Sequence, residues 1–208
     1  MAGDHNTQAG ARRRACLRCE RPLPACVCAW VRPTAHRVRV GLWQHPDEVG
    51  QAKNSARLLW LSLQACERHA PADLTAPLPA DWLQPGVALL YPTPPGEAAA
   101  GTAPSEPLQA EAVHTLVVLD GTWRQSRAML RAQPALAALP RLALPQGLLA
   151  AHGQRYRVRK AHQAGQLSTL ESVALALGHL QGDAAAFAPL LQAFEGWVDS
   201  LMARAGRA

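Results

Sequence analysis

Long apolar runs are missing from this chain of 208 residues. The longest, such as residues 87–91 and 116–119, fall far short of the roughly 18 apolar residues that a helix needs to cross a bilayer. Asp4, His5 and the three Arg at residues 12–14 leave the N-terminus without the apolar core of a signal peptide. We therefore expect a cytoplasmic protein with no membrane partner, whose length suits one main domain.

The common nucleotide-binding and hydrolytic motifs are also absent. No G-x-G-x-x-G follows a predicted strand, and the sequence contains neither a P-loop nor an H-E-x-x-H segment. No Ser/His/Asp order of the kind found in hydrolases stands out. Any binding pocket must therefore be built from strand ends and helix starts rather than from one of these motifs.

The net charge of +6 is concentrated in two basic blocks. Residues 1–40 contain eight Arg against two acids, and residues 120–162 contain eight Arg or Lys against Asp120 alone. Residues 41–119 contain eight acids and three bases. Clustered cations suit a polyanion such as RNA, because each neutralised phosphate releases condensed counterions. The alternative is an ordinary solvated surface in an Arg-rich chain.

The Cys-rich element, residues 16–34, contains four of the five Cys, namely Cys16, Cys19, Cys26 and Cys28. A C-x-x-C pair followed by a C-x-C pair can supply four thiolates to one tetrahedral zinc ion, as in a zinc knuckle. Disulfides and plain structural thiols are the alternatives, and the absence of a signal peptide disfavours the first. Arg18, Arg21 and Arg32 lie beside the cysteines, where they suggest contact with RNA or an exposed basic surface.

Three apolar segments have the pattern of buried strands. Residues 38–42 alternate in polarity, whereas residues 87–91 and 116–119 are continuous apolar runs. Residues 46–66 keep helical spacing on an apolar face made of Ala52, Ala56, Leu59, Leu63 and Cys66. Another helix is expected to begin at Thr122. This order predicts an α/β fold in which helices cover both faces of a parallel sheet.

In the C-terminal third, residues 141–144 predict a short strand and residues 156–160 a basic, extended segment. Ser168 followed by Glu171 forms a capping box, so a helix begins there. Its apolar side consists of Leu170, Val173, Ala174, Leu177 and Leu180. The apolar residues between 187 and 201 predict a last helix that packs on the domain.

Composition divides the chain into three parts. Residues 1–15 are polar and lack periodicity, which predicts a disordered basic arm. The Cys-rich element follows, and residues 35–208 form the α/β domain that would carry the chemistry. Within it, residues 94–114 predict a flexible surface loop. Residues 71–85 form a Pro-rich connection that Trp82 is expected to anchor.

Polar and aromatic candidates gather in three segments at predicted strand ends and helix starts: residues 91–92, 120–123 and 167–171. Ligands of open α/β sheets bind outside the carboxyl ends of the strands, so these segments would form one pocket if they meet. Asp120 and Thr122 could instead cap the following helix, and Trp123 could be a core anchor. His45, at another strand end, suits either a substrate or RNA contact or a structural hydrogen bond.

The Asp-Gly-Thr-Trp of residues 120–123, followed by Arg124 and Arg127, resembles the signature of the DTW-domain family. Further matches in the same order are the two Cys pairs, Gln-His-Pro-Asp-Glu ahead of Asn54, the strand ending in Tyr-Pro, and Leu-Ser-Thr-Leu-Glu, so the resemblance covers residues 16–180. It implies a SPOUT-like fold whose C-terminal part forms a deep knot that binds the cofactor. It also implies transfer of the 3-amino-3-carboxypropyl group of S-adenosylmethionine to N3 of a tRNA uridine, in bacteria typically in the variable loop, with release of methylthioadenosine.

The resemblance gives the candidate residues their expected roles. The catalytic set is Asp120, Thr122 and Trp123, with Asp120 as the base for uridine N3 and Trp123 stacked on a base or facing the sulfonium. The cofactor-binding set is Tyr91, Pro92, Leu119, Gly121, Leu167, Ser168 and Thr169, in which free N–H groups at the helix start would hold the cofactor carboxylate. The RNA-binding set is Arg124, Arg127, Arg155, Arg157, Arg159, Lys160 and His45.

Two other functions remain open. A SPOUT-like RNA methyltransferase would release S-adenosylhomocysteine instead of methylthioadenosine. A non-catalytic zinc-knuckle protein would bind RNA without a cofactor. For the first reading we expect tRNA and S-adenosylmethionine as partners, structural zinc and no obligate protein partner. Replacement of Asp120 by Ala would then abolish turnover while leaving the fold intact.

Overall fold

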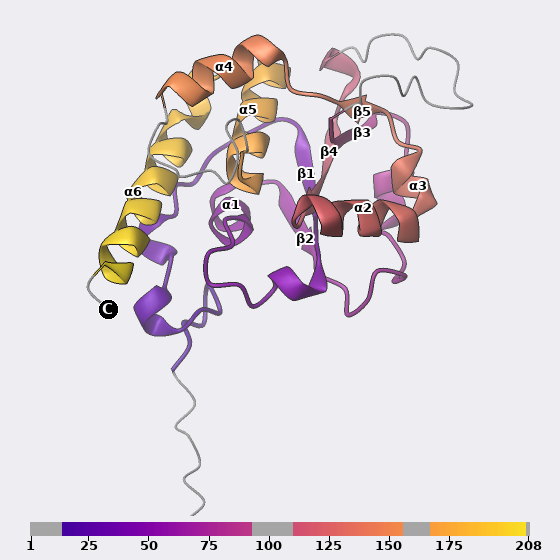
Figure 1. Ribbon diagram of the computed structural model, residues 1–208. Coiled ribbons are helices and arrows are strands. Elements are labelled where there is room, and N and C mark those ends of the chain that lie inside the picture. The colour runs from indigo at the N-terminus through magenta and orange to yellow at the C-terminus, as the bar shows by residue number, and fades with distance from the viewer. Residues whose placement is uncertain (1–13, 93–109, 156–166, 207–208) are drawn as a thin grey trace, which may run out of the picture.

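A five-stranded sheet forms the centre of the molecule (Figure 1), seen in a computed structural model that describes residues 14–92, 110–155 and 167–206. All neighbouring strands are parallel. Their order across the sheet is β2 (Cys66–His69), β1 (Arg39–Gln44), β4 (Thr115–Asp120), β3 (Val87–Leu90) and β5 (Arg141–Leu142). The predicted parallel sheet is therefore confirmed.

Helices cover both faces of this sheet, which confirms the predicted α/β architecture (Figure 1). One face is covered by α1 (Ala56–Ser62), α5 (Thr169–Gln181) and α6 (Ala188–Ala205). The other is covered by α2 (Trp123–Ala132) and α3 (Pro134–Ala137), and α4 (Gln146–Arg155) follows β5. Within the described ranges, no helix combines the length and the apolar character needed to cross a membrane.

Alternate residues of β1 divide between two apolar cores. Val40 and Leu42 belong to the core beneath α1, α5 and α6, whereas Trp43 belongs to the core beneath α2 and α3. Both faces of the central strands are therefore buried, as is usual for a parallel sheet. The first core also contains Cys19 and Val27, so the Cys-rich element packs against the same side of the molecule as α6.

Trp82 anchors the Pro-rich connection, as predicted, with only 1% of its surface exposed. Its indole packs against β1 at Gly41, where an added Cβ would lie 2.5 Å from Cε2 of Trp82. Glycine at this position allows the indole to lie directly against the strand backbone. The second core therefore depends on the close contact between the Trp82 indole and the backbone of Gly41.

The single helix predicted for residues 46–66 is wrong. Pro46–Glu48 form one 3₁₀ turn, α1 is short, and Cys66 begins β2. Leu63 leaves α1 with an extended backbone (φ −80°, ψ 129°), which interrupts the helical spacing before Cys66. Because β2 is a half-exposed edge strand with polar residues, neither an apolar run nor a clear alternation marks it in the sequence.

The C-terminal elements follow the predictions more closely. Ser168 and Glu171 form the capping box of α5, and the helix ends at Gly182 with a left-handed φ of 67°. The predicted apolar side of α5 is buried, and α6 packs on the domain as expected. β5 lies within the predicted short strand, but α3 and α4 were not anticipated. In α4, Gly147 and Gly153 weaken the helical pattern.

Some predicted segments lie outside the described residues. These are the basic arm before Arg14, residues 94–109 of the predicted surface loop, and the connection from α4 to α5, residues 156–166. Ala110–Ala112 form a 3₁₀ turn, and Val113 is buried just before β4. The knot implied by the resemblance stays a prediction.

We expect Gly41→Ala to destabilise the fold by about 2 kcal/mol, because overpacking forces Trp82 away from β1. Urea denaturation measures the change in the free energy of unfolding. Gly50→Ala is the matched control, because an added Cβ there meets no atom within 4 Å. Equal stability of the two variants would contradict the close contact between Gly41 and Trp82.

Candidate functional site

A pocket of about 330 Å³ lies at the carboxyl ends of β3, β4 and β5. All three segments that the sequence singled out contribute to its lining, through Tyr91, Pro92, Gly121, Thr122, Trp123, Leu167 and Thr169. Residues that follow β5 complete the wall: Ala143, Leu144, Gln146 and Leu149. The three segments therefore meet, at the sheet edge where ligands of parallel α/β folds bind. The contribution of the segment after β5 was not anticipated from the sequence.

Aromatic residues form the mouth of this pocket. The indole of Trp123 is 48% exposed, which excludes the core-anchor alternative, and it meets Tyr91 edge to face at 5.7 Å between ring centroids. The Tyr91 hydroxyl lies 3.3 Å from Oγ of Ser126, and the guanidinium of Arg141 lies over the Tyr91 ring at 5.4 Å. Arg141 and Ser126 were missed because nothing local relates either residue to Tyr91.

Thr122 caps α2. Its Oγ1 accepts from the backbone N–H of Gln125 at 3.3 Å, and the Gln125 side chain accepts from the Thr122 N–H at 2.7 Å. The cap explains why Thr stands at this position, since the free N–H groups of a helix start need acceptors. Thr122 also lines the pocket, so the cap places its backbone beside the site.

Asp120 is buried beside the pocket, with 2% of its surface exposed, and is not part of the lining. Oδ2 accepts hydrogen bonds from Nε2 of Gln44 and Nδ2 of Asn54, each at 2.7 Å. Oδ1 accepts from Oγ1 of Thr169, also at 2.7 Å. The carboxylate thus joins the end of β1, the loop before α1 and the first turn of α5. Buried charged groups persist only with such partners.

The start of α5 differs from the anion site that the sequence suggested. The N–H of Leu170 donates to Oγ of Ser55, and the N–H of Glu171 donates to Oγ of Ser168. Ser168 is engaged by the capping box and does not line the pocket, whereas Thr169 does. Two N–H groups of the first turn therefore already have protein acceptors. The helix start contributes Thr169 to the pocket lining.

The predicted RNA-binding residues are found in different settings. Arg124 and Arg127 are exposed on α2, close to Trp123 in the sequence. The side chain of His45 is only 12% exposed, and its Nδ1 accepts from the N–H of Asp47, so the structural alternative describes it better. Arg155 is the last residue of α4, and Arg157, Arg159 and Lys160 lie outside the described residues.

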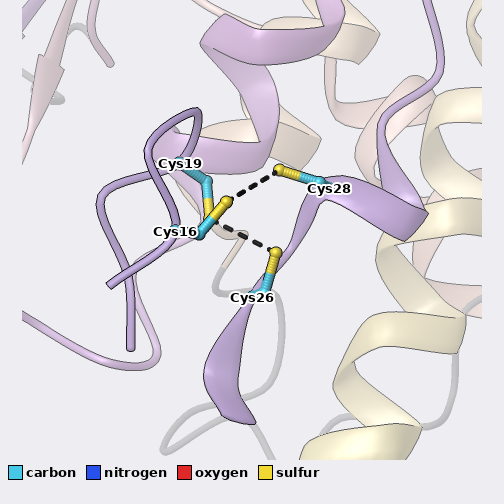
Figure 2. Close-up of side chains that lie close together, drawn as sticks. All are labelled: Cys16, Cys19, Cys26 and Cys28. Carbon is cyan, nitrogen blue, oxygen red and sulfur yellow. Dashed lines mark hydrogen bonds between the residues drawn. The ribbon is translucent and has the colours of Figure 1, made fainter. Parts of the chain in front are cut away.

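The four clustered thiols lie in a geometry that could hold a metal ion (Figure 2). All four Sγ atoms are within 4.8 Å of one another, with 3.7 Å between Cys16 and Cys28 and 3.6 Å between Cys19 and Cys26. A tetrahedral site with thiolate bonds of about 2.3 Å needs sulfur separations of about 3.8 Å. None of these cysteines forms a disulfide. Backbone N–H groups of Cys19 and Arg18 lower the pKa of Cys16 to about 6, whereas burial raises the pKa of Cys28 to about 12, so the support for a metal is the geometry of the four sulfur atoms.

Two buried Arg tie the Cys-rich element to the loop that carries Asn54. Arg21 donates to the carbonyls of Ala52 at 2.6 Å and Asn54 at 2.7 Å, and its guanidinium lies over the indole of Trp197. Arg57 donates to the carbonyls of Cys19 and of the loop residue Val49. Contact between Arg21 and RNA is therefore wrong as a prediction, because only 5% of its surface is exposed. Arg21 holds the backbone of the loop instead.

Comparison with known proteins relates the chain to one protein family and to a curated relative. A family model described as the DTW domain matches residues 13–202. A curated protein of Drosophila melanogaster, named tRNA-uridine aminocarboxypropyltransferase 2, is 31% identical over 184 residues, which cover 82% of this chain and 68% of that relative. No solved structure matches the chain.

We expect the purified protein to contain one tightly bound metal ion per chain, held by the four clustered thiols. Cys28→Ser should abolish the metal and lower the melting temperature, because a thiolate ligand is lost. Elemental analysis and thermal melting measure the two effects. Cys66→Ser is the control: Cys66 is remote from the cluster, and burial raises the pKa of its thiol to about 12. Full metal content in Cys28→Ser would refute the site.

The network around Asp120 changes the expectation for Asp120→Ala. Loss of the carboxylate leaves the side chains of Gln44, Asn54 and Thr169 without their shared acceptor, so we expect a loss of stability of about 2 kcal/mol. Chemical denaturation measures it, with Asp199→Ala on the exposed side of α6 as the control. If both variants unfold at the same denaturant concentration, Asp120 does not hold these segments together.

Proposed function

The chain belongs to the DTW-domain family, and we propose that it modifies tRNA by transferring the 3-amino-3-carboxypropyl group of S-adenosylmethionine to N3 of a uridine. The strongest support comes from the pocket, which is lined by Thr122 and Trp123 of the family signature together with Thr169. The signature residues lie at the start of α2, whereas Thr169 begins α5. The name of the relative supports the substrate class and the reaction. Methylthioadenosine is the expected by-product.

The pocket suits a ligand with a large apolar part and a few polar groups. Its volume falls at the lower end of the roughly 300–1,000 Å³ of small-molecule sites. Leu and Val side chains and the backbone of strand ends make up much of the lining, where an adenine ring and an aliphatic chain can be buried. We assign S-adenosylmethionine to it, with a contacting set of Tyr91, Pro92, Leu119, Gly121, Leu167 and Thr169.

The reaction joins uridine N3 to the carbon beside the sulfonium, breaks the bond from that carbon to sulfur, and releases the N3 proton. Placing the two reactants in contact supplies much of the acceleration, since it replaces a bimolecular encounter. Trp123 is exposed at the mouth, where it can stack on the uracil or present its face to the sulfonium. Asp120 is buried, so we assign it an indirect part, exerted through the side chains that it holds.

The tRNA is proposed to approach along α2. Arg124 and Arg127 are exposed there, beside Trp123, and Arg131 continues the same exposed side toward the end of the helix. Cations in such a row can follow a phosphate backbone while a base enters the pocket. A uridine of the variable loop is the proposed target. Arg155, Arg157, Arg159 and Lys160 are proposed as additional phosphate contacts.

Zinc is the proposed metal of the Cys-rich element. Four thiolates in a closed tetrahedral set are typical of structural zinc and leave no position for a substrate. The carbonyls held by Arg21 and Arg57 connect this element to the loop of Asn54. We therefore propose that zinc maintains the shape of the site and takes no part in the transfer.

Incubation of the protein with unmodified tRNA and S-adenosylmethionine tests the function directly. Digestion of the RNA and mass spectrometry of its nucleosides should show a uridine heavier by one aminocarboxypropyl group. A methylated nucleoside together with S-adenosylhomocysteine would replace the reaction with that of a methyltransferase. Binding of tRNA without any new nucleoside would contradict catalysis on that RNA.

Trp123→Ala should reduce kcat/KM by about fivefold to 150-fold, because stacking of a base on an aromatic side chain contributes about 1–3 kcal/mol. Leu83→Ala is the matched control, since Leu83 is also an exposed, large apolar residue but does not line the pocket. Equal activity of the two variants would remove Trp123 from the proposed site.

A further inference from the structure

Thr169 lines the pocket, and its hydroxyl donates a hydrogen bond to Asp120. A hydroxyl has one proton, and an ionised carboxylate can only accept. The bond of 2.7 Å from Thr169 Oγ1 to Asp120 Oδ1 therefore commits that proton to Asp120. What remains on the Thr169 oxygen is acceptor capacity.

The side chains around Asp120 fix the direction of this bond. Oε1 of Gln44 accepts from Nε of Arg68 at 2.9 Å, and Oδ1 of Asn54 accepts from the N–H of Ala56 at 2.9 Å. Both amide oxygens are thus occupied, so both NH₂ groups face Asp120 Oδ2 and donate to it. The Asp120 carboxylate is therefore the acceptor in all three bonds, and the Thr169 hydroxyl is a donor in its own.

We propose that Thr169, held in this orientation by Asp120, accepts a hydrogen bond from an N–H group of the bound reactants. The inference rests on the proposed function and gives the pocket a specific acceptor. The N–H donors of the reactants include the ammonium and the adenine amino group of S-adenosylmethionine, and N3–H of the uracil. A bond from either group of S-adenosylmethionine would support cofactor binding, whereas a bond from N3–H would support the transfer step.

If uracil is the donor, the same pair also provides a route for the proton. N3 forms its bond to carbon while the carbon–sulfur bond breaks, the N3 proton passes to the Thr169 oxygen, and the Thr169 proton passes to Asp120 Oδ1. Asp120 ends as the neutral acid, and methylthioadenosine leaves with the electron pair of the broken bond. Asp120 is a positioning residue when the donor belongs to S-adenosylmethionine.

Three substitutions test whether Thr169 accepts a hydrogen bond from a reactant or only supports the fold. Thr169→Val keeps the shape and removes the acceptor. Thr169→Ser keeps the hydroxyl and should restore most of what Thr169→Val loses. In Asp120→Asn, the amide oxygen should take the place of Oδ2, because Gln44 and Asn54 both donate there, and the amide NH₂ should then donate to Thr169. The Thr169 hydroxyl would then be free to donate its proton to a ligand, so it would act as a donor where the wild type offers an acceptor.

The measurements are calorimetric binding of S-adenosylmethionine and single-turnover transfer to tRNA at saturating S-adenosylmethionine. We expect Thr169→Val and Asp120→Asn each to reduce one of these by tenfold or more, and the double variant to be no worse than either alone. Weaker cofactor binding assigns the donor to S-adenosylmethionine. Unchanged cofactor binding with slower transfer identifies N3–H. Thr75→Val is the matched control, because the Thr75 hydroxyl also donates to a carboxylate, that of Asp73, on the exposed surface.

Melting temperatures ensure that only folded variants are compared, and Asp120→Asn tests the idea independently should Thr169→Val not fold. Binding and transfer by Thr169→Val at the level of the wild type would overturn the inference and leave the proposed function intact. Additive defects of the two substitutions would also overturn it, because Asp120 would then act without Thr169. A wild-type protein that neither binds S-adenosylmethionine nor modifies tRNA would refute the proposed function and this inference with it.

Discussion

The buried carboxylate of Asp120 holds together segments that lie far apart in the chain. Its hydrogen bonds reach the end of β1, the loop before α1 and the first turn of α5, so two strand ends and a helix start are fixed against one another. The donors have to converge on Asp120, because a buried carboxylate without partners would be strongly unfavourable. The hydrogen bonds of the Asp120 carboxylate therefore define the side of the pocket next to α5, whereas apolar packing defines the other walls.

The Cys-rich element extends this constraint across the molecule. Arg21 leaves it to hold the carbonyls of Ala52 and Asn54, and the Asn54 side chain ends at Asp120. A short segment of this kind has few apolar side chains of its own, so a metal cross-link is an effective way to define its conformation. The metal would then influence the pocket through backbone carbonyls, without contact with any reactant.

Features encoded by neighbouring residues could be predicted from the sequence, and those that depend on distant partners could not. The apolar runs of β3 and β4 and the capping box of α5 are local, and each prediction was confirmed. Gln44 and Asn54 act through Asp120, which is 76 and 66 residues away, so no spacing reveals them. The burial of Arg21 was hidden for the same reason, because its acceptors are carbonyls, which any residue type supplies. The short, polar strand β2 illustrates the opposite error. Its first residue, Cys66, continues a helical spacing by coincidence, and the sequence therefore predicted a helix where a strand begins.

The edge strand of the sheet beside the pocket is β5, which is also the shortest strand. β5 pairs with β3 at two positions, Leu89 with Arg141 and Leu90 with Leu142. The next residues, Ala143 and Leu144, are already part of the pocket wall. A strand with such short pairing opens at a lower free energy than the whole domain does. Transient separation of β5 would therefore widen the pocket without disturbing the carboxylate on its opposite side, so ligand exchange rates and ligand affinity can be set by different parts of the fold.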